Sequence, residues 1–213
     1  MVVAVWALWG YMSSRIDWPD AGVPLAAHPN PDDRHRAAAW ALQRLVRRDF
    51  VVVDTETTGL GSDDQVLEVA VVDPSGKVLV DQLVRPTCPI HPRATAVHGY
   101  DAPALSAAPT FLQVLPALRA SLGGALAIAY NAPFDERLIR QSAAAWDTEP
   151  VETTWECAMR WYAQYTGRVS SGRGGYASPK LPRAEADQQR HGARRDCLLT
   201  LRLLTRMAIP LSG

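Results

Sequence analysis

A run of three valines followed by two acids constrains this chain more than any other stretch. Residues 51–60 read Val-Val-Val-Asp-Thr-Glu-Thr-Thr-Gly-Leu. The valines predict a buried strand, and because side chains alternate along a strand, Asp54 and Glu56 point to the same face. Two carboxylates at the end of a buried strand repel each other and lose water. A divalent cation would relieve both costs, and an all-oxygen site suits Mg²⁺ or Mn²⁺ better than Zn²⁺. A strand end with solvated acids is the competing interpretation of this stretch alone.

The composition indicates a globular protein without a charge bias. The chain has 213 residues, 47% of them apolar, which is enough for one domain, or one domain with an appendage. Lys and Arg together number 22, as do Asp and Glu, so a nucleic-acid partner would depend on local patches, a metal or a helper protein. Three cysteines without a C-x-x-C pair argue against a disulfide framework and a zinc site. They fit a reducing cytosol, and we expect a cytoplasmic protein.

The N-terminal segment differs in composition from the rest. We expect an arm and linker over residues 1–31 and a single domain over residues 32–213. Residues 2–9 are strand-like and contain two tryptophans, which suits an extra strand or arm lying on the domain. They equally suit an element that binds a partner protein or a second copy of the chain. We expect no signal peptide and no membrane contact, because a basic leader and an apolar run of roughly 18 residues are both missing.

Periodicity and turn residues predict strands alternating with helices. The strands are expected at residues 51–57, 66–72, 78–84, 125–130 and 151–154. The helices are expected at residues 31–48, 94–99, 110–122, 133–146, 156–165 and 192–208. Pro116 is expected to kink its helix or to mark a second start. An antiparallel meander followed by alternating strands and helices predicts an α/β fold with a mixed sheet.

Two further carboxylates fall at the ends of predicted elements. Asp135 follows a strand end and opens a helix, and Asp196 lies in the first turns of the last helix. Because the carboxyl ends of parallel strands converge on one crevice, the strands ending at Asp54 and Asn131 are expected side by side. Four acids could then surround two metal ions. His191 stands five residues before Asp196, about 140° away on a helix, so we expect it on the preceding loop.

At this point the sequence resembles a known family. Residues 54–60, residues 131–135 (Asn-Ala-Pro-Phe-Asp) and the pattern His191-x-x-x-x-Asp196 are similar to the three motifs of the DEDDh 3′–5′ exonucleases. This is the superfamily of RNase T and of the polymerase proofreading domains. Residues 97–99 (Val-His-Gly) are similar to its intermediate motif. The resemblance covers about residues 35–208. It implies an RNase H-like fold with a mixed five-stranded sheet flanked by helices.

The resemblance also implies catalytic roles. Asp54, Glu56 and Asp196 would hold the metal that carries the attacking water. Asp54 would bridge to a second metal near Asp135, and both ions would be Mg²⁺ or Mn²⁺. His191 would act as the general base, which suits an imidazole with an ordinary pKa near 6.5.

Substrate contacts are implied at the turn after the first strand and beyond. The backbone of Thr57 would meet the terminal 3′-OH, Leu60 would be a wedge against the last base, and His98 and Phe134 would be walls of the pocket. Asn131 would contact substrate or only tie down its turn. Core packing is the alternative for Leu60 and Phe134, and a purely structural role is the alternative for His98.

We therefore predict a metal-dependent 3′–5′ exonuclease that releases nucleoside monophosphates from single-stranded DNA or RNA 3′ ends. DNA is slightly favoured, although no motif reads the 2′-OH. One alternative is an accessory module recruited through its N-terminal arm to a polymerase or a CRISPR-adaptation complex. Another is an RNA-processing enzyme of the RNase T or oligoribonuclease kind. Arg194, Arg195 and the Gly/Ser-rich loop at residues 166–179 could reach a phosphate backbone or simply face solvent.

Overall fold

A five-stranded sheet forms the centre of the molecule. The computed structural model describes residues 24, 27–172, 174–183 and 191–209. The strands are β1 (Phe50–Thr57), β2 (Val66–Val72), β3 (Val78–Leu83), β4 (Leu126–Ala129) and β5 (Thr154–Cys157). Their order is β3-β2-β1-β4-β5. Strands β3, β2 and β1 are antiparallel, whereas β1, β4 and β5 run parallel. The predicted mixed sheet, a meander followed by parallel strands, is confirmed.

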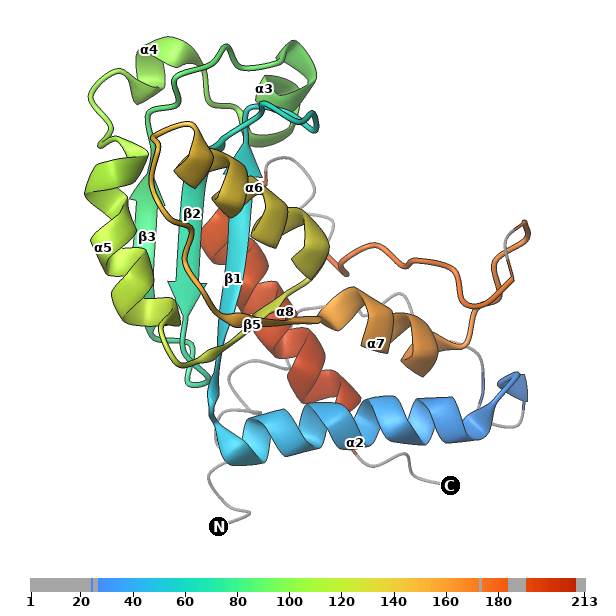
Figure 1. Cartoon of the computed structure of the whole chain (residues 1–213). Helices are drawn as coiled ribbons and strands as arrows, with labels where there is room; N and C mark the ends of the chain where they lie inside the picture. The colour runs from blue at the N-terminus through green and yellow to red at the C-terminus, as the bar shows by residue number, and fades with distance from the viewer. Residues whose placement is uncertain (1–23, 25–26, 173, 184–190, 210–213) are drawn as a thin grey trace.

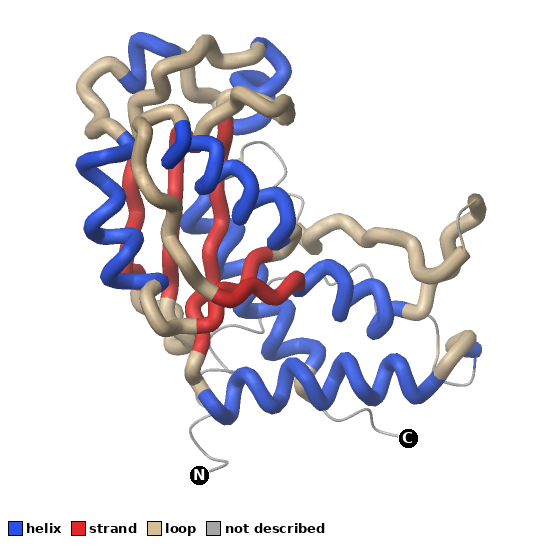
Figure 2. The backbone as a smooth tube through the Cα atoms, in the orientation of Figure 1, coloured by secondary structure: helices blue, strands red, loops and turns tan. Residues whose placement is uncertain are grey.

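Helices cover both faces of this sheet. Figures 1 and 2 show α5 and α6 in front of the strands, α8 behind them, and α2 along the bottom beneath α7. The helices are α2 (Pro31–Arg47), α3 (Pro92–His98), α4 (Ala102–Leu105), α5 (Phe111–Leu122), α6 (Ala132–Ala144), α7 (Ala158–Thr166) and α8 (Ala193–Met207). The sheet therefore has a hydrophobic core on each side.

The valines of β1 contribute to both cores. Val51 and Val53 pack with residues of α5 and α6, while Val52 packs with residues of α2, α7 and α8. This alternation explains why three consecutive β-branched residues are buried. On α8, Cys197, Leu201 and Leu204 form the buried stripe that packs against the sheet, as their spacing predicts. The strand that carries the first two acids is thus fixed from both faces.

Two predicted boundaries are wrong, and one helix was not foreseen. Strand β5 begins at Thr154 instead of Val151, because residues 154–157 pair in parallel with β4. Glu156 therefore belongs to a strand and does not begin a helix. Helix α5 continues through Pro116 without a second start. The short helix α4 between α3 and α5 had no clear periodic signal.

The end of the predicted linker packs on the domain. The strand-like stretch at residues 2–9 lies outside the described residues. Further along, His28 is buried, and its Nε2 lies 2.8 Å from the backbone oxygen of Gln164 at the end of α7. Its ring also lies 5.8 Å from the ring of Tyr176. Among the described residues, every helix is too short or too polar to span a bilayer.

Candidate active site

Four carboxylates from three elements line one cavity. Asp54 and Glu56 lie in the second half of β1. Asp135 and Asp196 each occupy the fourth position of a helix, α6 and α8 respectively, where the helix dipole favours negative charge. Parallel pairing of β1 with β4 places the start of α6 beside the end of β1, and α8 packs across β1 and β2. All four acids line a cavity of about 980 Å³. The side-by-side arrangement of these two strands, predicted from sequence, is confirmed.

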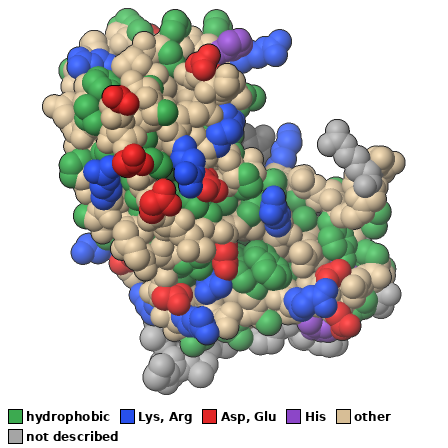
Figure 3. Space-filling view, in the orientation of Figure 1, with side chains coloured by type: hydrophobic (Ala, Val, Ile, Leu, Met, Phe, Trp, Pro, Cys, Tyr) green, Lys and Arg blue, Asp and Glu red, His purple; other side chains and the backbone are tan. Residues whose placement is uncertain are grey.

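The loop between α7 and α8 forms another wall of this cavity. Its lining residues are Arg168, Ala177, Ser178, Pro179, Lys180, Leu181, Pro182 and Arg183. The hydroxyl of Tyr130, at the end of β4, donates a hydrogen bond of 2.7 Å to the carbonyl of Pro179 and fastens the loop to the sheet. Three basic residues of this wall, Arg168, Lys180 and Arg183, therefore line the same cavity as the four acids. Elsewhere charges of both signs are mixed, as Figure 3 shows for the face viewed there.

Burial and neighbouring carboxylates raise the pKa of Asp54, Glu56 and Asp135. Burial and the neighbouring Asp135, Asp196 and Glu56 hold the pKa of Asp54 well above its usual value. Burial, followed by Asp196 and Glu68, raises the pKa of Glu56 to about 8. Burial likewise raises the pKa of Asp135 to about 7. Without a cation Asp54, Glu56 and Asp135 therefore tend to retain protons near neutral pH, since ionising all three would add several like charges to one buried site.

A threonine that the sequence analysis overlooked supports Asp135. The hydroxyl of Thr55 donates a 2.8 Å hydrogen bond to Oδ1 of Asp135, and both side chains are buried. This bond and a backbone bond from Thr55 lower the pKa of Asp135, against the larger effect of burial. Thr55 lies between the two acids of β1, yet nothing in a D-T-E pattern indicates that the middle residue would reach α6.

The donor set fits a divalent cation. Glu56, His191 and Asp196 each offer one ligand atom, and these three atoms lie within 4.8 Å of one another. Oδ1 of Asp196 is buried and has no hydrogen-bond partner in the described part of the chain. An unpartnered buried oxygen among crowded carboxyls is costly unless a cation binds it. Hard oxygen ligands of this kind suit Mg²⁺ or Mn²⁺.

His191 lies on the loop immediately before α8, where its spacing from Asp196 predicted it. Its Nδ1 is 3.5 Å from Oδ2 of Asp196, and its backbone N–H donates to the carbonyl of Val97 at 3.2 Å. Burial and the neighbouring Arg183 lower the pKa of His191, and Asp196 opposes them. The imidazole is therefore neutral at neutral pH and can accept a proton.

Arg183 is the second residue that sequence reasoning missed. Its Nη2 donates to Oδ2 of Asp196 and lies 3.0 Å from Nδ1 of His191. It belongs to an irregular loop, eight residues before His191 and outside every motif, so no local pattern marks it. Arg194, by contrast, pairs with Asp81 of β3 at 3.4 Å and does not line the cavity.

The expected substrate-binding residues fall into two groups. Asn131 and Phe134 line the cavity, and Phe134 also packs partly into the core. Thr57, Leu60 and His98 lie outside its lining. Thr57 is the last residue of β1, Leu60 lies on the turn that follows, and His98 ends α3. Leu60 is 79% exposed, which rules out core packing for this side chain.

Several contacts hold the turn that carries Leu60. Asp64 accepts bonds from the hydroxyl of Thr58 at 2.7 Å and from the N–H of Gly61 at 2.6 Å. Arg137 of α6 donates to the carbonyl of Gly61 at 2.9 Å, and its guanidinium carbon lies 5.4 Å from the ring centroid of Phe134. The turn is therefore joined to the same helix that carries Asp135.

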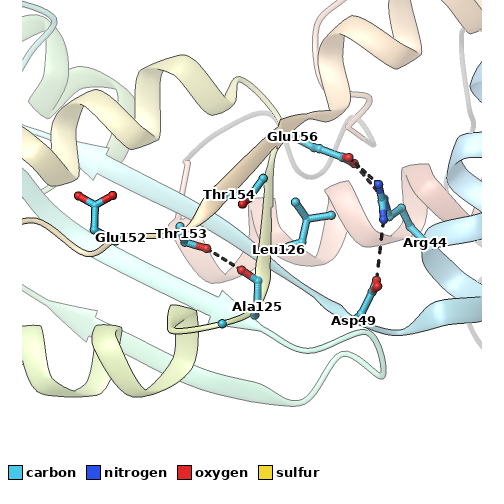
Figure 4. Close-up of a pocket in the computed structure, with 9 residues that line it drawn as sticks. Arg44, Asp49, Ala125, Leu126, Glu152, Thr153, Thr154 and Glu156 are labelled. Carbon is cyan, nitrogen blue, oxygen red and sulfur yellow. Dashed lines mark hydrogen bonds and ion pairs between the residues drawn. The ribbon is translucent and has the colours of Figure 1, made fainter.

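A second cavity, of about 660 Å³, lies at the opposite end of the sheet, by the amino ends of β4 and β5. Figure 4 shows Arg44 between Asp49 and Glu156, its principal charged neighbours. Arg44 contacts both oxygens of Glu156, at 2.6 and 3.0 Å, and Trp40 donates to the same carboxylate at 2.6 Å. These groups satisfy one another and anchor α2 to β5, so this cavity is structural and the acidic one is the candidate active site.

Comparison with known proteins gives consistent matches. The RNase T family model, described as exonuclease, matches residues 51–204. The uncharacterized exonuclease CP81 of Escherichia phage 186 is 33% identical over 185 residues, which are 81% of this chain and 92% of that protein. A DNA polymerase III subunit epsilon-like protein of Rhodobacter capsulatus is 38% identical over 112 residues, 49% of this chain but 16% of its own length. Exodeoxyribonuclease 10 of Escherichia coli K12 is 34% identical over 98 residues, 45% of this chain and 42% of that protein.

Solved structures share the fold. Exonuclease X in complex with 5′ overhanging duplex DNA has a TM-score of 0.54 and 26% identity, over 74% of this chain and 90% of that one. The nuclease domain of 3′hExo, a DEDDh family member bound to rAMP, has a TM-score of 0.57 over 75% of this chain and 92% of that one. Its identity of 15% supports a common fold alone.

Proposed function

This chain belongs to the RNase T exonuclease family, whose model covers residues 51–204, and from that premise we propose that it removes nucleotides from the 3′ ends of single-stranded DNA. The observation that carries the proposal is the convergence of Asp54, Glu56, Asp135 and Asp196 on one cavity with His191 at its edge. DNA is favoured because two relatives are named as a DNA polymerase subunit-like protein and an exodeoxyribonuclease.

The acids are assigned by their positions. Asp54, Glu56 and Asp196 would hold one divalent ion, and Asp135 together with Asp54 would hold the second. When bound, two such ions activate water and offset charge on the leaving oxygen of a phosphodiester. The chain's own part is to fix these oxygens on rigid elements, with Thr55 orienting Asp135. His191, neutral and 42% exposed, accepts the proton of the attacking water.

The terminal nucleotide would lie between the cavity and the turn after β1. Phe134 and Asn131 form one side of its binding site, and the exposed Leu60 forms a wedge on the other. The backbone of Thr57 and the buried His98 support that turn near the 3′-OH. The basic wall with Arg168 and Lys180 would contact the phosphates of the preceding nucleotides. Because the chain has zero net charge, its attraction for nucleic acid has to come from a local basic patch of this kind.

We also propose that residues 32–213 form the catalytic domain and that residues 1–31 form an arm for a protein partner or a second copy. The similarity to a polymerase III epsilon-like protein over 16% of its length favours such an accessory module as the second candidate. An RNA-processing enzyme is a third possibility that the substrate test separates.

The test uses end-labelled oligonucleotides and a matched pair of variants. DNA and RNA strands labelled at the 5′ end, single-stranded or in duplexes, are incubated with Mg²⁺ or Mn²⁺. The expected result is a ladder shortening from the 3′ end, with nucleoside 5′-monophosphates as products. Asp135→Asn should abolish it, because the amide cannot supply the charge that the metal requires.

Glu136→Gln is the control, because Glu136 is the adjacent residue of α6 and pairs with Arg140 away from the cavity. It removes the same charge and should leave the ladder unchanged. Cleavage from the 5′ end, or equal activity of Asp135→Asn and the parent, would refute the assignment. Faster degradation of RNA than of DNA would instead support the RNA-processing enzyme.

A further inference from the structure

Arg183 makes an incomplete ion pair at the centre of the acidic site. Its side chain is 12% exposed, and Nη2 contacts both Oδ2 of Asp196 and Nδ1 of His191. Its other terminal nitrogen, Nη1, is buried and has no hydrogen-bond partner among the described residues, and the same holds for Oδ1 of Asp196. A permanent arginine–carboxylate pair commonly uses two parallel hydrogen bonds. Here one atom on each side is left unsatisfied, so the pair is not optimised as a lasting structural bond.

The two groups that Arg183 contacts are also two of the three that could share a cation. Asp196 and His191 form that set with Glu56. A guanidinium bonded to Oδ2 of Asp196 and a divalent ion bound by the same cluster compete for the same negative charge and the same space. The positive charge of Arg183 partly opposes the rise in the pKa of Asp54 and Glu56, as a bound cation would.

We propose, on the basis of the function proposed above, that Arg183 is an internal counter-ion that metal binding displaces and that then binds a substrate phosphate. In the metal-free protein the guanidinium neutralises Asp196. When the metals bind, Arg183 leaves this carboxylate and joins the basic wall formed by Lys180 and Arg168. There it pairs with a phosphate oxygen of the nucleic-acid strand, for which a guanidinium is well suited.

The anchoring of the loop makes this exchange feasible. Leu181, two residues earlier, packs against the core on the α8 side of the sheet, and Pro179 is held by Tyr130. The backbone on that side of Arg183 can therefore stay in place while the side chain rotates. An arginine side chain has enough rotatable bonds to move its head group by several ångströms.

The test measures two opposite effects of replacing Arg183: tighter binding of metal and weaker binding of nucleic acid. The full chain is titrated with Mn²⁺ by calorimetry in the absence of nucleic acid. Arg183→Gln, which keeps the length of the side chain but not its charge, should bind Mn²⁺ about 3- to 10-fold more tightly than the parent, because the competing cation is gone. Arg183→Lys should lie between them. At saturating Mn²⁺, Arg183→Gln should raise the KM for a single-stranded oligonucleotide about 5- to 10-fold while kcat changes little.

Arg194→Gln is the matched control. Arg194 lies on α8 two residues before Asp196, is directed to Asp81, and loses the same charge without entering the cavity. It should bind Mn²⁺ as the parent does, which separates direct competition from a general change in charge. Thermal unfolding of each variant without metal checks the fold, and Arg183→Lys carries the test if Arg183→Gln unfolds.

Equal or weaker Mn²⁺ binding by Arg183→Gln than by the control would overturn the displacement. Tighter Mn²⁺ binding with an unchanged KM would overturn the transfer to phosphate. A parent protein that binds Mn²⁺ but degrades no nucleic acid would instead refute the proposed function, while the metal titration would still decide the role of Arg183.

Discussion

The metal-free protein should lose stability as the pH rises, and Glu56 should cause a large part of the loss. The folded protein raises the pKa of Glu56 from 4.5 to about 8. Below pH 4.5 the group is protonated in both the folded and the unfolded chain and has no effect. As the pH rises, the unfolded chain releases the proton first, so unfolding becomes more favourable until the folded protein also releases it near pH 8.

The size of this effect follows from the same two values. Each unit of pKa difference corresponds to about 1.36 kcal/mol, so ionising Glu56 completely would cost about 5 kcal/mol of the free energy of unfolding. About 4 kcal/mol of this loss is reached at pH 8, and less than about 1 kcal/mol at pH 5. His98 and His191 act in the opposite direction. Their pKa values are lowered by burial, so their contribution to stability increases as the pH rises toward 6.5.

Glu56→Gln isolates the contribution of this carboxyl because the amide is neutral at every pH. Urea unfolding of parent and variant is measured at pH 5, 6, 7 and 8 with a chelator. The variant should match the parent at pH 5 and become more stable than it by several kcal/mol at pH 8. Adding Mg²⁺ at pH 8 should raise the free energy of unfolding of the parent but not that of the variant. A parent that is as stable as the variant at pH 8 without metal would refute the reasoning.

Three further substitutions test supporting contacts. Thr55→Val removes the hydroxyl that donates a hydrogen bond to Asp135. We expect kcat to fall about 10-fold and the free energy of unfolding to fall by about 1–2 kcal/mol. Unchanged kinetics would contradict a role of Thr55 in positioning Asp135. Leu60→Ala should alter the free energy of unfolding by less than about 0.5 kcal/mol because the side chain is exposed, yet raise the KM for single-stranded DNA several-fold in steady-state assays. Ser142→Ala removes the hydroxyl that accepts the N–H of Val66 at 2.8 Å; urea unfolding should show a cost of about 1–3 kcal/mol, whereas kcat should stay at the parent value.

The parts of the fold that sequence reasoning predicted are those set by local signals. The valines before Asp54, the proline at the start of α6 and the stripe on α8 each fix an element through its own periodicity or capping. The placement of His191 on the loop before α8 followed from helix geometry, because a residue five positions before Asp196 on a helix would lie about 140° away from it. These local rules also placed the acids at element ends, which is why the pattern of the site was predictable from single residues.

The errors arise where a distant part of the chain decides. Strand β5 begins at Thr154 because β4 offers hydrogen bonds to residues 154–157, although the residues just before look equally strand-like. The bond from Thr55 to Asp135 crosses 80 positions of sequence. Arg183 reaches Asp196 from a loop without periodicity. Such contacts depend on how elements pack, and composition or spacing carries no record of them.

His28 determines how far the chain can be shortened from its N-terminus. Its ring lies against Gly167, whose φ of +69° ends α7, and a Cβ at Gly167 would come within 2.2 Å of that ring. Gly167 is also the first residue of the loop that brings Arg168 and Lys180 to the cavity. A fragment that begins at Pro31 would keep every acid of the active site but leave the base of this loop without its support. An expression fragment for binding studies should therefore begin before residue 27, even when the preceding segment is to be removed.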